Sequence, residues 1–330
     1  MLERHEAFFS KWGVKMETEN QYEGITRMLN VSIENLYEHN QHILCQIEEG
    51  INTHVIPNPV VGYQGVPGAY GEEATYTYFK EKWSKIIAHD SFEDVIEALI
   101  EGKIDYGVLP IENSSAGEVL DTYDLIKNNE LYIVGEQSIK IEQNLLAIPG
   151  TKIEDIEEVY SHSQGLNQSK EFLKQYPKMK TCPYINTATA CKHVADLKDK
   201  TKAAIGSKRA GKLYGLENLA PNINFNKNNF TRFIVLANKM NITNDSDKIS
   251  IVFSTEHLSG ALYNILGYFA HNGLNLIKIQ SRPLLDKKWE YYFFADLEGN
   301  LEQANVLIAL SQIMNQCSYF KILGNYKQCD

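Results

Sequence analysis

The feature that most constrains the fold is the alternation of short apolar runs with amphipathic segments between residues 60 and 238. Seven runs are typical of strands: VVGYQG, YGVLPI, LYIVG, NLLAI, EEVYSH, AAIG and RFIVLA. Helical spacing lies between them, at about 72–83, 92–101, 119–126, 164–174 and 188–197. Strands separated by helices indicate an open α/β sheet, wholly or partly parallel. The span is long enough for two small lobes.

A different order of elements follows the polar, turn-rich stretch NKMNITNDSDK, where we expect a domain boundary. The strand KISIVFS leads to a helix over 259–270 and the strand LNLIKIQSRP. The strand WEYYFFADL, a helix over 302–314 and the strand YFKILGNY complete the pattern. This βαββαβ order predicts a ferredoxin-like domain over 248–326.

The first 57 residues are expected to form an N-terminal helical extension. Apolar residues recur at helical spacing from Ile25 to Ile47, and Gly50 predicts the end of that helix. The two prolines of IPNPV then predict a linker.

Composition excludes several classes of protein. The net charge of −10 argues against nucleic-acid binding, which needs a basic face. No apolar run reaches the roughly 18–20 residues that cross a bilayer, and the start MLERHEAFFSKWG lacks the pattern of a signal peptide. The five cysteines are scattered, and no metal-ligand spacing occurs. We therefore expect a cytoplasmic protein without a membrane segment or a metal site.

Four loops place small residues and hydroxyls before a helix start: YQGVPGAYGEEAT, LPIENSSAGEVL, SHSQGLNQS and INTATACKHVA. Free N–H groups at helix starts bind carboxylate or phosphate, and ligands gather at strand ends in open sheets. The alternative is helix capping, since Ser115 and Glu118 match a capping box and Thr187 an N-cap. His162 is expected to make only local hydrogen bonds. The glycines match neither GxGxxG nor a P-loop, so nucleotide binding is unsupported.

The stretch NNFTRF places the hydroxyl residue Thr231 next to the cationic Arg232 at the start of an apolar run. Successive strand residues point to opposite faces, so on a regular strand Arg232 would face away and brace the lobe. If the strand begins only at Phe233, both side chains reach a ligand. Both alternatives stay open here, and the second is favoured.

Taken in order, these stretches resemble the motifs of prephenate dehydratases, with VYSHSQGLNQSKEFL, AAIGSKRAGKLYGLENLA and NNFTRF among them. SGALYNIL and IQSRP resemble the GAL and ESRP motifs of the regulatory ACT domain that follows in that family. The resemblance covers about 60–326. It implies a two-lobed catalytic domain over 58–240, similar to type II periplasmic binding proteins, with lobes at about 60–138 plus 216–240 and at 139–215.

The resemblance implies that the chain converts prephenate to phenylpyruvate, with loss of water and carbon dioxide, on the route to phenylalanine. No metal or organic cofactor is implied. Thr231 would be the catalytic residue, helping the ring hydroxyl leave as water by donating a hydrogen bond or relaying a proton. The substrate-binding residues that carry over are Asn113, Ser114, Thr187, Arg232 and Phe233.

In the ACT-like domain the resemblance implies feedback regulation by L-phenylalanine. The effector-binding residues that carry over are Gly260, Ala261, Leu262, Asn275, Ser281, Arg282 and Pro283. Ordinary packing is the alternative for Ala261 and Leu262 taken alone. The resemblance also implies a homodimer or homotetramer.

Four positions depart from the family pattern. Ser163 stands where proline is usual, and Asn186 where serine is usual. Phe225 replaces a common acidic residue, which leaves open what activates Thr231. Gln280 replaces a glutamate of the regulatory motif, so effector affinity could differ because a charge is lost.

Alternatives to this activity are an arogenate dehydratase and a catalytically inactive amino-acid sensor, although a sensor would not need Thr231. A solute-binding lipoprotein is disfavoured by the missing signal sequence. Some family members carry an N-terminal chorismate mutase, which needs about three helices and several cations. Residues 1–57 supply one good helix and four Lys or Arg residues, so a degenerate remnant or an oligomerisation helix is the favoured interpretation.

Overall fold

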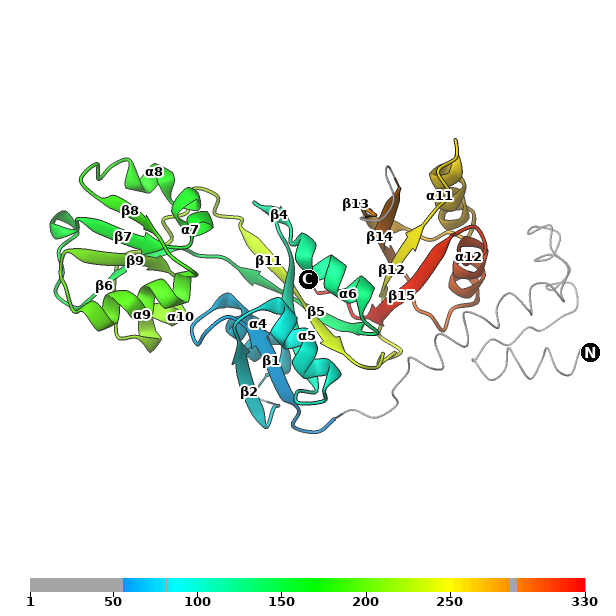
Figure 1. The fold of residues 1–330 in the computed structure, drawn as a ribbon, viewed down its shortest axis with the longest axis horizontal. Helices are drawn as coiled ribbons and strands as arrows, with labels where there is room; N and C mark the ends of the chain where they lie inside the picture. Colours follow the sequence, from blue (N-terminus) through cyan, green and yellow to red (C-terminus); the bar gives the residue numbers. More distant parts are fainter. Residues whose placement is uncertain (1–55, 81, 285–289, 330) are drawn as a thin grey trace, which may run out of the picture. The chain divides into compact units, whose positions relative to one another are not determined.

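The computed structural model describes residues 56–80, 82–284 and 290–329 (Figure 1). The helix predicted within the first 57 residues therefore lies outside the described residues. The described chain forms two compact units, which we treat separately. One holds residues 56–125, 136–236 and 329, and the other holds residues 126–135 and 237–328.

A mixed sheet in strand order β2-β1-β3-β11-β5, with β4 paired to β3, forms the first lobe. Its strands are β1 (Val60–Gln64), β2 (Lys85–His89), β3 (Tyr106–Asn113), β4 (Gly117–Glu118), β5 (Tyr132–Lys140) and β11 (Phe230–Ala237), and its helices are α4 (Tyr70–Phe79), α5 (Phe92–Ile100) and α6 (Leu120–Asn128). Strand β1 runs parallel to β2 and β3, whereas β11 runs antiparallel to β3. The expected partly parallel sheet is therefore confirmed.

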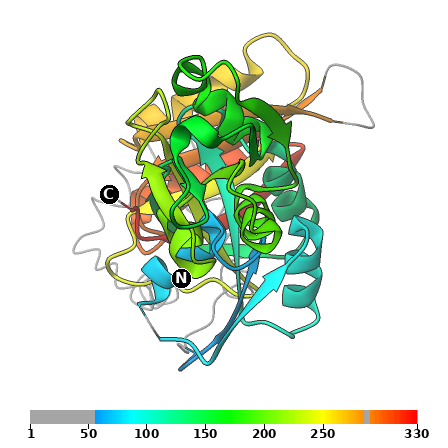
Figure 2. The same cartoon turned by 90° about the vertical axis from the view of Figure 1, so that its left-hand side faces the viewer.

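A five-stranded sheet in the order β10-β6-β9-β7-β8 forms the second lobe. Its strands are β6 (Asn144–Ala147), β7 (Glu158–Ser161), β8 (Lys180–Pro183), β9 (Lys202–Gly206) and β10 (Glu217–Ala220), and its helices are α7 (Ser163–Gln168), α8 (Lys170–Leu173), α9 (Thr187–Leu197) and α10 (Lys208–Leu213). Leu145 packs with residues of α7 and α8, and Leu146 packs with residues of α9 and α10. Because neighbouring strand residues face opposite ways, these helix pairs cover opposite faces of the sheet (Figures 1 and 2).

Several elements were not predicted from the sequence. Strand β2 is half exposed and β8 is mostly exposed, and neither was among the runs identified in the sequence. Strand β10 pairs with β6 in the second sheet, although the resemblance placed residues 216–240 with the first lobe. The helix expected over 164–174 is divided into α7 and α8 at Ser169.

The second unit confirms the ferredoxin-like order of elements. It contains β12 (Lys248–Ser254), α11 (Ala261–His271), β13 (Leu276–Pro283), β14 (Tyr291–Glu298), α12 (Ala304–Met314) and β15 (Tyr319–Tyr326). The four strands form an antiparallel sheet in the order β13-β14-β12-β15. Ile251 and Phe253 of β12 pack with Phe269 of α11 and Leu310 of α12 in one buried core.

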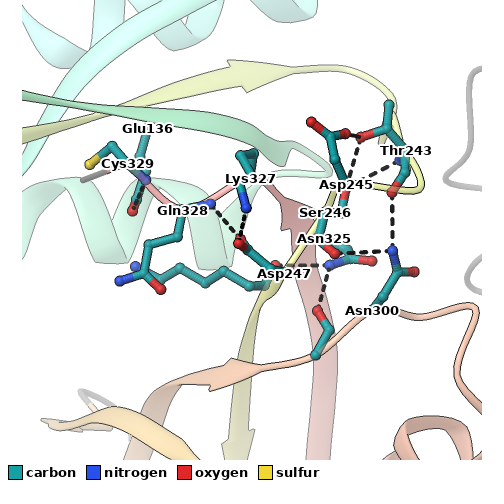
Figure 3. A network of polar contacts seen from close by, with 12 residues as sticks. Glu136, Thr243, Asp245, Ser246, Asp247, Asn300, Asn325, Lys327, Gln328 and Cys329 are labelled. Carbon is teal, nitrogen blue, oxygen red and sulfur yellow. Dashed lines mark hydrogen bonds and ion pairs between the residues drawn. The ribbon is translucent and has the colours of Figure 1, made fainter.

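Polar contacts order the turn that precedes β12 (Figure 3). The Asp247 carboxylate accepts the backbone N–H of Gln328 at 2.7 Å and pairs with Lys327. Asn300 donates to the backbone carbonyls of Thr243 and Ser246, each at 3.0 Å. The polar stretch expected to mark a boundary is therefore a turn that is fixed by hydrogen bonds.

A close approach of backbones joins the loop before α4 to helix α10. Gly68 has a φ of 90°, and a Cβ placed on it would lie 3.1 Å from the Ala210 Cα. The Ser207 hydroxyl donates to the Gly68 carbonyl at 3.0 Å. Glu72 accepts both the Gly68 N–H and the Arg209 Nε–H, at 2.9 and 2.8 Å. This loop therefore needs glycine for its conformation and for its space.

We expect Gly68→Ala to lower the free energy of unfolding by about 1 kcal/mol or more beyond the loss in Gly102→Ala. Gly102 has a φ of 69° but open space around its Cβ position, so it controls for backbone strain alone. Urea denaturation measures both variants. Equal losses would show that the contact with Ala210 relaxes without cost.

Candidate active site

The side chains of Thr231 and Asn113 meet where β11 begins and β3 ends. These residues are paired in the antiparallel ladder, and the Asn113 amide Nδ2 lies 2.9 Å from the Thr231 Oγ. The same amide group donates to the Asn229 Oδ1 at 2.8 Å. Thr231 is half-buried, whereas Asn113 and Asn229 are buried.

The orientation of the Asn113 amide is set by its own loop. Its Oδ1 accepts the backbone N–H groups of Ser115 and Ala116, both at 2.9 Å. The Nδ2 side must then face β11. Asn113 is therefore the donor to Thr231, and the threonine oxygen is the acceptor. Since a hydroxyl carries one hydrogen and two lone pairs, Thr231 keeps its own hydrogen to donate to another group.

The asparagine-rich loop ties the two chain segments that connect the lobes. Asn224 accepts the N–H of Gln143 at 3.1 Å and donates to the Ile141 carbonyl at 3.3 Å. The Ile141 N–H donates to the Asn229 carbonyl at 2.8 Å. These amide side chains therefore position the segment that leads into Thr231.

Arg232 forms ion pairs with two carboxylates of neighbouring strands. Its guanidinium lies 2.8 Å from Glu112 of β3 and 3.2 Å from Glu136 of β5. The Glu136 side chain is 1% exposed and also accepts the backbone N–H of Cys329 at 3.0 Å (Figure 3). Strand β11 begins at Phe230, so the favoured expectation that it starts at Phe233 is wrong. The register shifts between Arg232 and Phe233, and the contacts of Arg232 support the bracing alternative.

Side chains cap the starts of α7 and α9, which follow two of the four loops identified in the sequence. Asn186, and not Thr187, is the N-cap of α9, with Thr189 completing a capping box. The capping box expected at Ser115 and Glu118 is wrong, because Gly117–Glu118 forms β4 and α6 begins at Leu120. His162 caps α7 by accepting the Gln164 N–H at 3.3 Å, as a local hydrogen-bonding residue should.

The second lobe contributes a buried amide pair near Thr187. The Gln143 Nε2 donates to the Gln168 Oε1 at 3.1 Å. Gly165 lies next to both Thr187 and Gln143. A Cβ placed on this glycine would be 3.4 Å from the Thr187 Cγ2 and 3.7 Å from the Gln143 Nε2. The Gln143 Oε1 and the Asn229 Nδ2 are buried without a hydrogen-bond partner among the described residues. Buried polar atoms without partners are uncommon in native proteins and are candidates for ligand contacts.

Sequence reasoning missed several of these residues. Gln143, Gln168 and Asn229 are amides that no catalytic spacing identifies, and Glu112 and Glu136 become neighbours of Arg232 only through strand pairing. Ser114 was identified, and it lies in the same loop as Asn113. Its hydroxyl accepts the Phe230 N–H at 2.9 Å.

The other expected site residues have different surroundings. Phe233 is 4% exposed and lies in the core, whereas Phe225 is largely exposed. Every expected effector-binding residue is exposed or partly exposed in the ferredoxin-like domain. Gly260 has a φ of 84°, which glycine adopts most readily, and it directly precedes α11.

Neither a membrane helix nor a metal cluster is found in the described ranges. None of their helices is long and apolar enough to cross a bilayer. No three His, Cys, Asp or Glu side chains in those ranges are grouped so that they could hold a metal ion.

Two α/β lobes, joined by crossing segments and followed by a ferredoxin-like domain, define a type II periplasmic-binding-protein-like architecture with an added small domain. The sequence model of the family described as prephenate dehydratase matches residues 61–241. The chain belongs to the prephenate dehydratase family, and it is an enzyme of the lyase class.

Similar proteins include two curated relatives. The bifunctional chorismate mutase/prephenate dehydratase of Escherichia coli K12 is 34% identical over 92% of this chain and 78% of its own length. Arogenate dehydratase 5 of Arabidopsis thaliana is 36% identical over 81% of this chain and 67% of its own length.

Two solved structures have a TM-score of 0.74 and 28% identity with this chain. One is a prephenate dehydratase from Arthrobacter aurescens in complex with L-Phe, matched over 82% of this chain and 90% of its own. The other, GqqA, is described as a novel type of quorum-quenching acylase and is matched over 82% of this chain and 98% of its own.

Proposed function

We propose that the chain converts prephenate to phenylpyruvate and that Thr231 assists departure of the ring hydroxyl. The bond between the ring and the carboxylate breaks, and its electron pair enters the ring as carbon dioxide leaves. The ring C–O bond breaks at the same time, and the oxygen takes up a proton and leaves as water. The product is aromatic, which drives the reaction.

The hydrogen bond from Asn113 to Thr231 carries this proposal. A threonine hydroxyl is a weak acid, so it needs support when it donates to a leaving oxygen. Asn113 donates to the Thr231 oxygen at 2.9 Å, which stabilises negative charge there and directs the hydroxyl hydrogen elsewhere. Phe225 carries no acid, so we assign the support of Thr231 to this amide. Positioned donors of this kind typically contribute about 10²–10⁴-fold to rate.

The substrate carboxylates need partners other than Arg232, which is paired with Glu112 and Glu136. We assign one to the start of α9 at Thr187, where backbone N–H groups and the helix dipole favour an anion. We assign the other to Ser114, whose hydroxyl would exchange its 3.2 Å hydrogen bond to the Asn228 carbonyl for one to the substrate. Arg232 is then a positioning residue that fixes β11 beneath Thr231. Phe233, buried in the core, acts by packing.

Regulation by L-phenylalanine is the second part of the proposal. We place the effector at the expected residues of the GAL and SRP motifs, around Gly260 and Arg282. Support comes from the related structure that holds L-Phe. Exposed Tyr263 on α11 and Ile279 on the edge strand β13 suit self-association as a homodimer or homotetramer. The expected cytoplasmic location and the role of residues 1–57 stay predictions.

Arogenate is the second candidate substrate, because an arogenate dehydratase is among the similar proteins. Arogenate carries an amino group where prephenate carries a keto oxygen. The chemistry at the ring is the same for both. The proposed role of Thr231 therefore holds for either substrate, and only the side-chain pocket would differ.

A turnover assay on prephenate and arogenate, with and without L-phenylalanine, tests the function. We expect turnover of prephenate and its inhibition by L-phenylalanine. Faster turnover of arogenate would assign the second activity. Turnover of neither substrate, together with binding of L-phenylalanine, would contradict the proposal and identify an amino-acid sensor. Turnover that L-phenylalanine leaves unchanged would contradict the regulatory part alone.

A further inference from the structure

A polar cavity of about 560 Å³ lies in the unit that holds the ferredoxin-like domain. Its walls come from the end of α6, the start of β5, residues 238–239 and the start of β15. None of the expected effector-binding residues lines it. Small-molecule sites commonly have volumes of about 300–1,000 Å³, so the cavity has the size of a ligand site.

The charges around this cavity are unusual for an acidic chain. Lys127, Lys239 and Lys321 line it, and Glu130 is the acidic side chain among its lining residues. The protein as a whole carries a net charge of −10. Three ammonium groups against one carboxylate therefore create a local positive potential, which is what attracts a small anion.

Lys321 is held at the inner wall by the end of α6. Its Nζ donates to the Ile126 carbonyl at 3.1 Å and to the Asn129 carbonyl. Burial lowers the pKa of Lys321 to about 8, and the nearby Glu130 acts in the opposite direction. A purely structural role for Lys321, as a cap on the end of α6, would use two of the three hydrogens of its ammonium group. Such a role does not explain why Lys127 and Lys239 line the same cavity.

Aromatic rings fix a second cation and give the cavity flat walls. The Lys127 Nζ lies 4.0 Å from the centre of the Tyr292 ring. Tyr292 packs edge to face against Tyr319, which lines the cavity together with Tyr132. A ligand here would meet both lysine and tyrosine side chains.

We propose that this cavity is a binding site for a small organic dianion that carries carboxylate or phosphate groups. Three lysines line its wall, and its volume of about 560 Å³ exceeds what one inorganic phosphate ion fills. The site is independent of the proposed catalytic function. It is also independent of the proposed L-phenylalanine site, because the two share no residue.

Isothermal titration of the full chain with succinate, inorganic phosphate and neutral succinamide, at constant ionic strength, tests this site. We expect succinate to bind and succinamide not to bind. Phosphate binding as tight as that of succinate would indicate a phosphate site instead of a carboxylate site, within the same proposal. No binding of either anion at millimolar concentration, or equal binding of succinamide, would overturn it.

Variants of opposite charge separate a binding site from a structural role. Lys239→Met should weaken succinate binding about fivefold or more, the factor for losing one unit charge about 4 Å away in water. Glu130→Gln should tighten binding when measured at about pH 6.5, where Lys321, with its pKa of about 8, keeps its proton, and misfolding cannot produce such a gain. Lys174→Met, at an exposed lysine paired with Glu171, controls for overall charge. If Lys174→Met weakens binding as much as Lys239→Met, or if Glu130→Gln weakens it, the proposal is wrong.

Discussion

Replacing Thr231 by valine is expected to lower kcat by about 10²–10⁴-fold, with little change in KM. Valine keeps the shape of threonine but has no hydroxyl to donate to the leaving oxygen. Because this interaction develops in the transition state, kcat and kcat/KM should fall together. Steady-state formation of phenylpyruvate from prephenate measures both constants.

The matched control for this prediction is Thr231→Ser, which keeps the hydroxyl and should stay within about tenfold of the parent. Urea denaturation checks that the valine variant remains folded. The valine substitution removes one acceptor of Asn113, but the Asn229 Oδ1 remains at 2.8 Å. A kcat of Thr231→Val within threefold of the parent would contradict the catalytic assignment.

Removal of the Arg232 charge should have the largest effect on stability. Arg232→Met removes the guanidinium that contacts the Glu136 carboxylate, whose side chain is 1% exposed. Removing one partner of a buried ion pair costs about 3–5 kcal/mol, and we expect a loss of this size in the free energy of unfolding. Glu112 should contribute less, because its side chain is 30% exposed and water can solvate it.

A double variant distinguishes this charge effect from lost packing. Arg232→Met combined with Glu136→Gln removes both charges and should recover more than half of the loss. Lys174→Met breaks an exposed ion pair with Glu171 and should change stability by less than about 1 kcal/mol. No recovery in the double variant would mean that Arg232 stabilises β11 by packing and not by its pair with Glu136.

Local patterns in the sequence predicted the elements that have strong apolar periodicity. Strands β3, β11 and β12 are rich in apolar residues, and their burial on a sheet follows from composition. Strand β8 could not be predicted in this way, since KTCP is mostly exposed and forms a strand because β7 pairs with it. The membership of β10 in the second sheet likewise depends on its pairing with β6.

The candidate site was predictable only in part for the same physical reason. Asn113 and Ser114 stood out as polar groups where a strand ends, whereas the role of Thr231 followed from the family resemblance. The hydrogen bond that joins Asn113 and Thr231 depends on the antiparallel register between β3 and β11. The partners of Arg232 depend on that same register and on β5, so the sequence alone left its direction open.

A crystal structure with a non-reactive prephenate analogue that retains the ring hydroxyl would show which side chain donates to the leaving oxygen. We expect the Thr231 Oγ to lie within about 2.5–3.0 Å of the ring oxygen, while Asn113 still donates to the Thr231 Oγ. A ring oxygen out of reach of Thr231, with another side chain as its donor, would show that Thr231 does not assist departure of the hydroxyl.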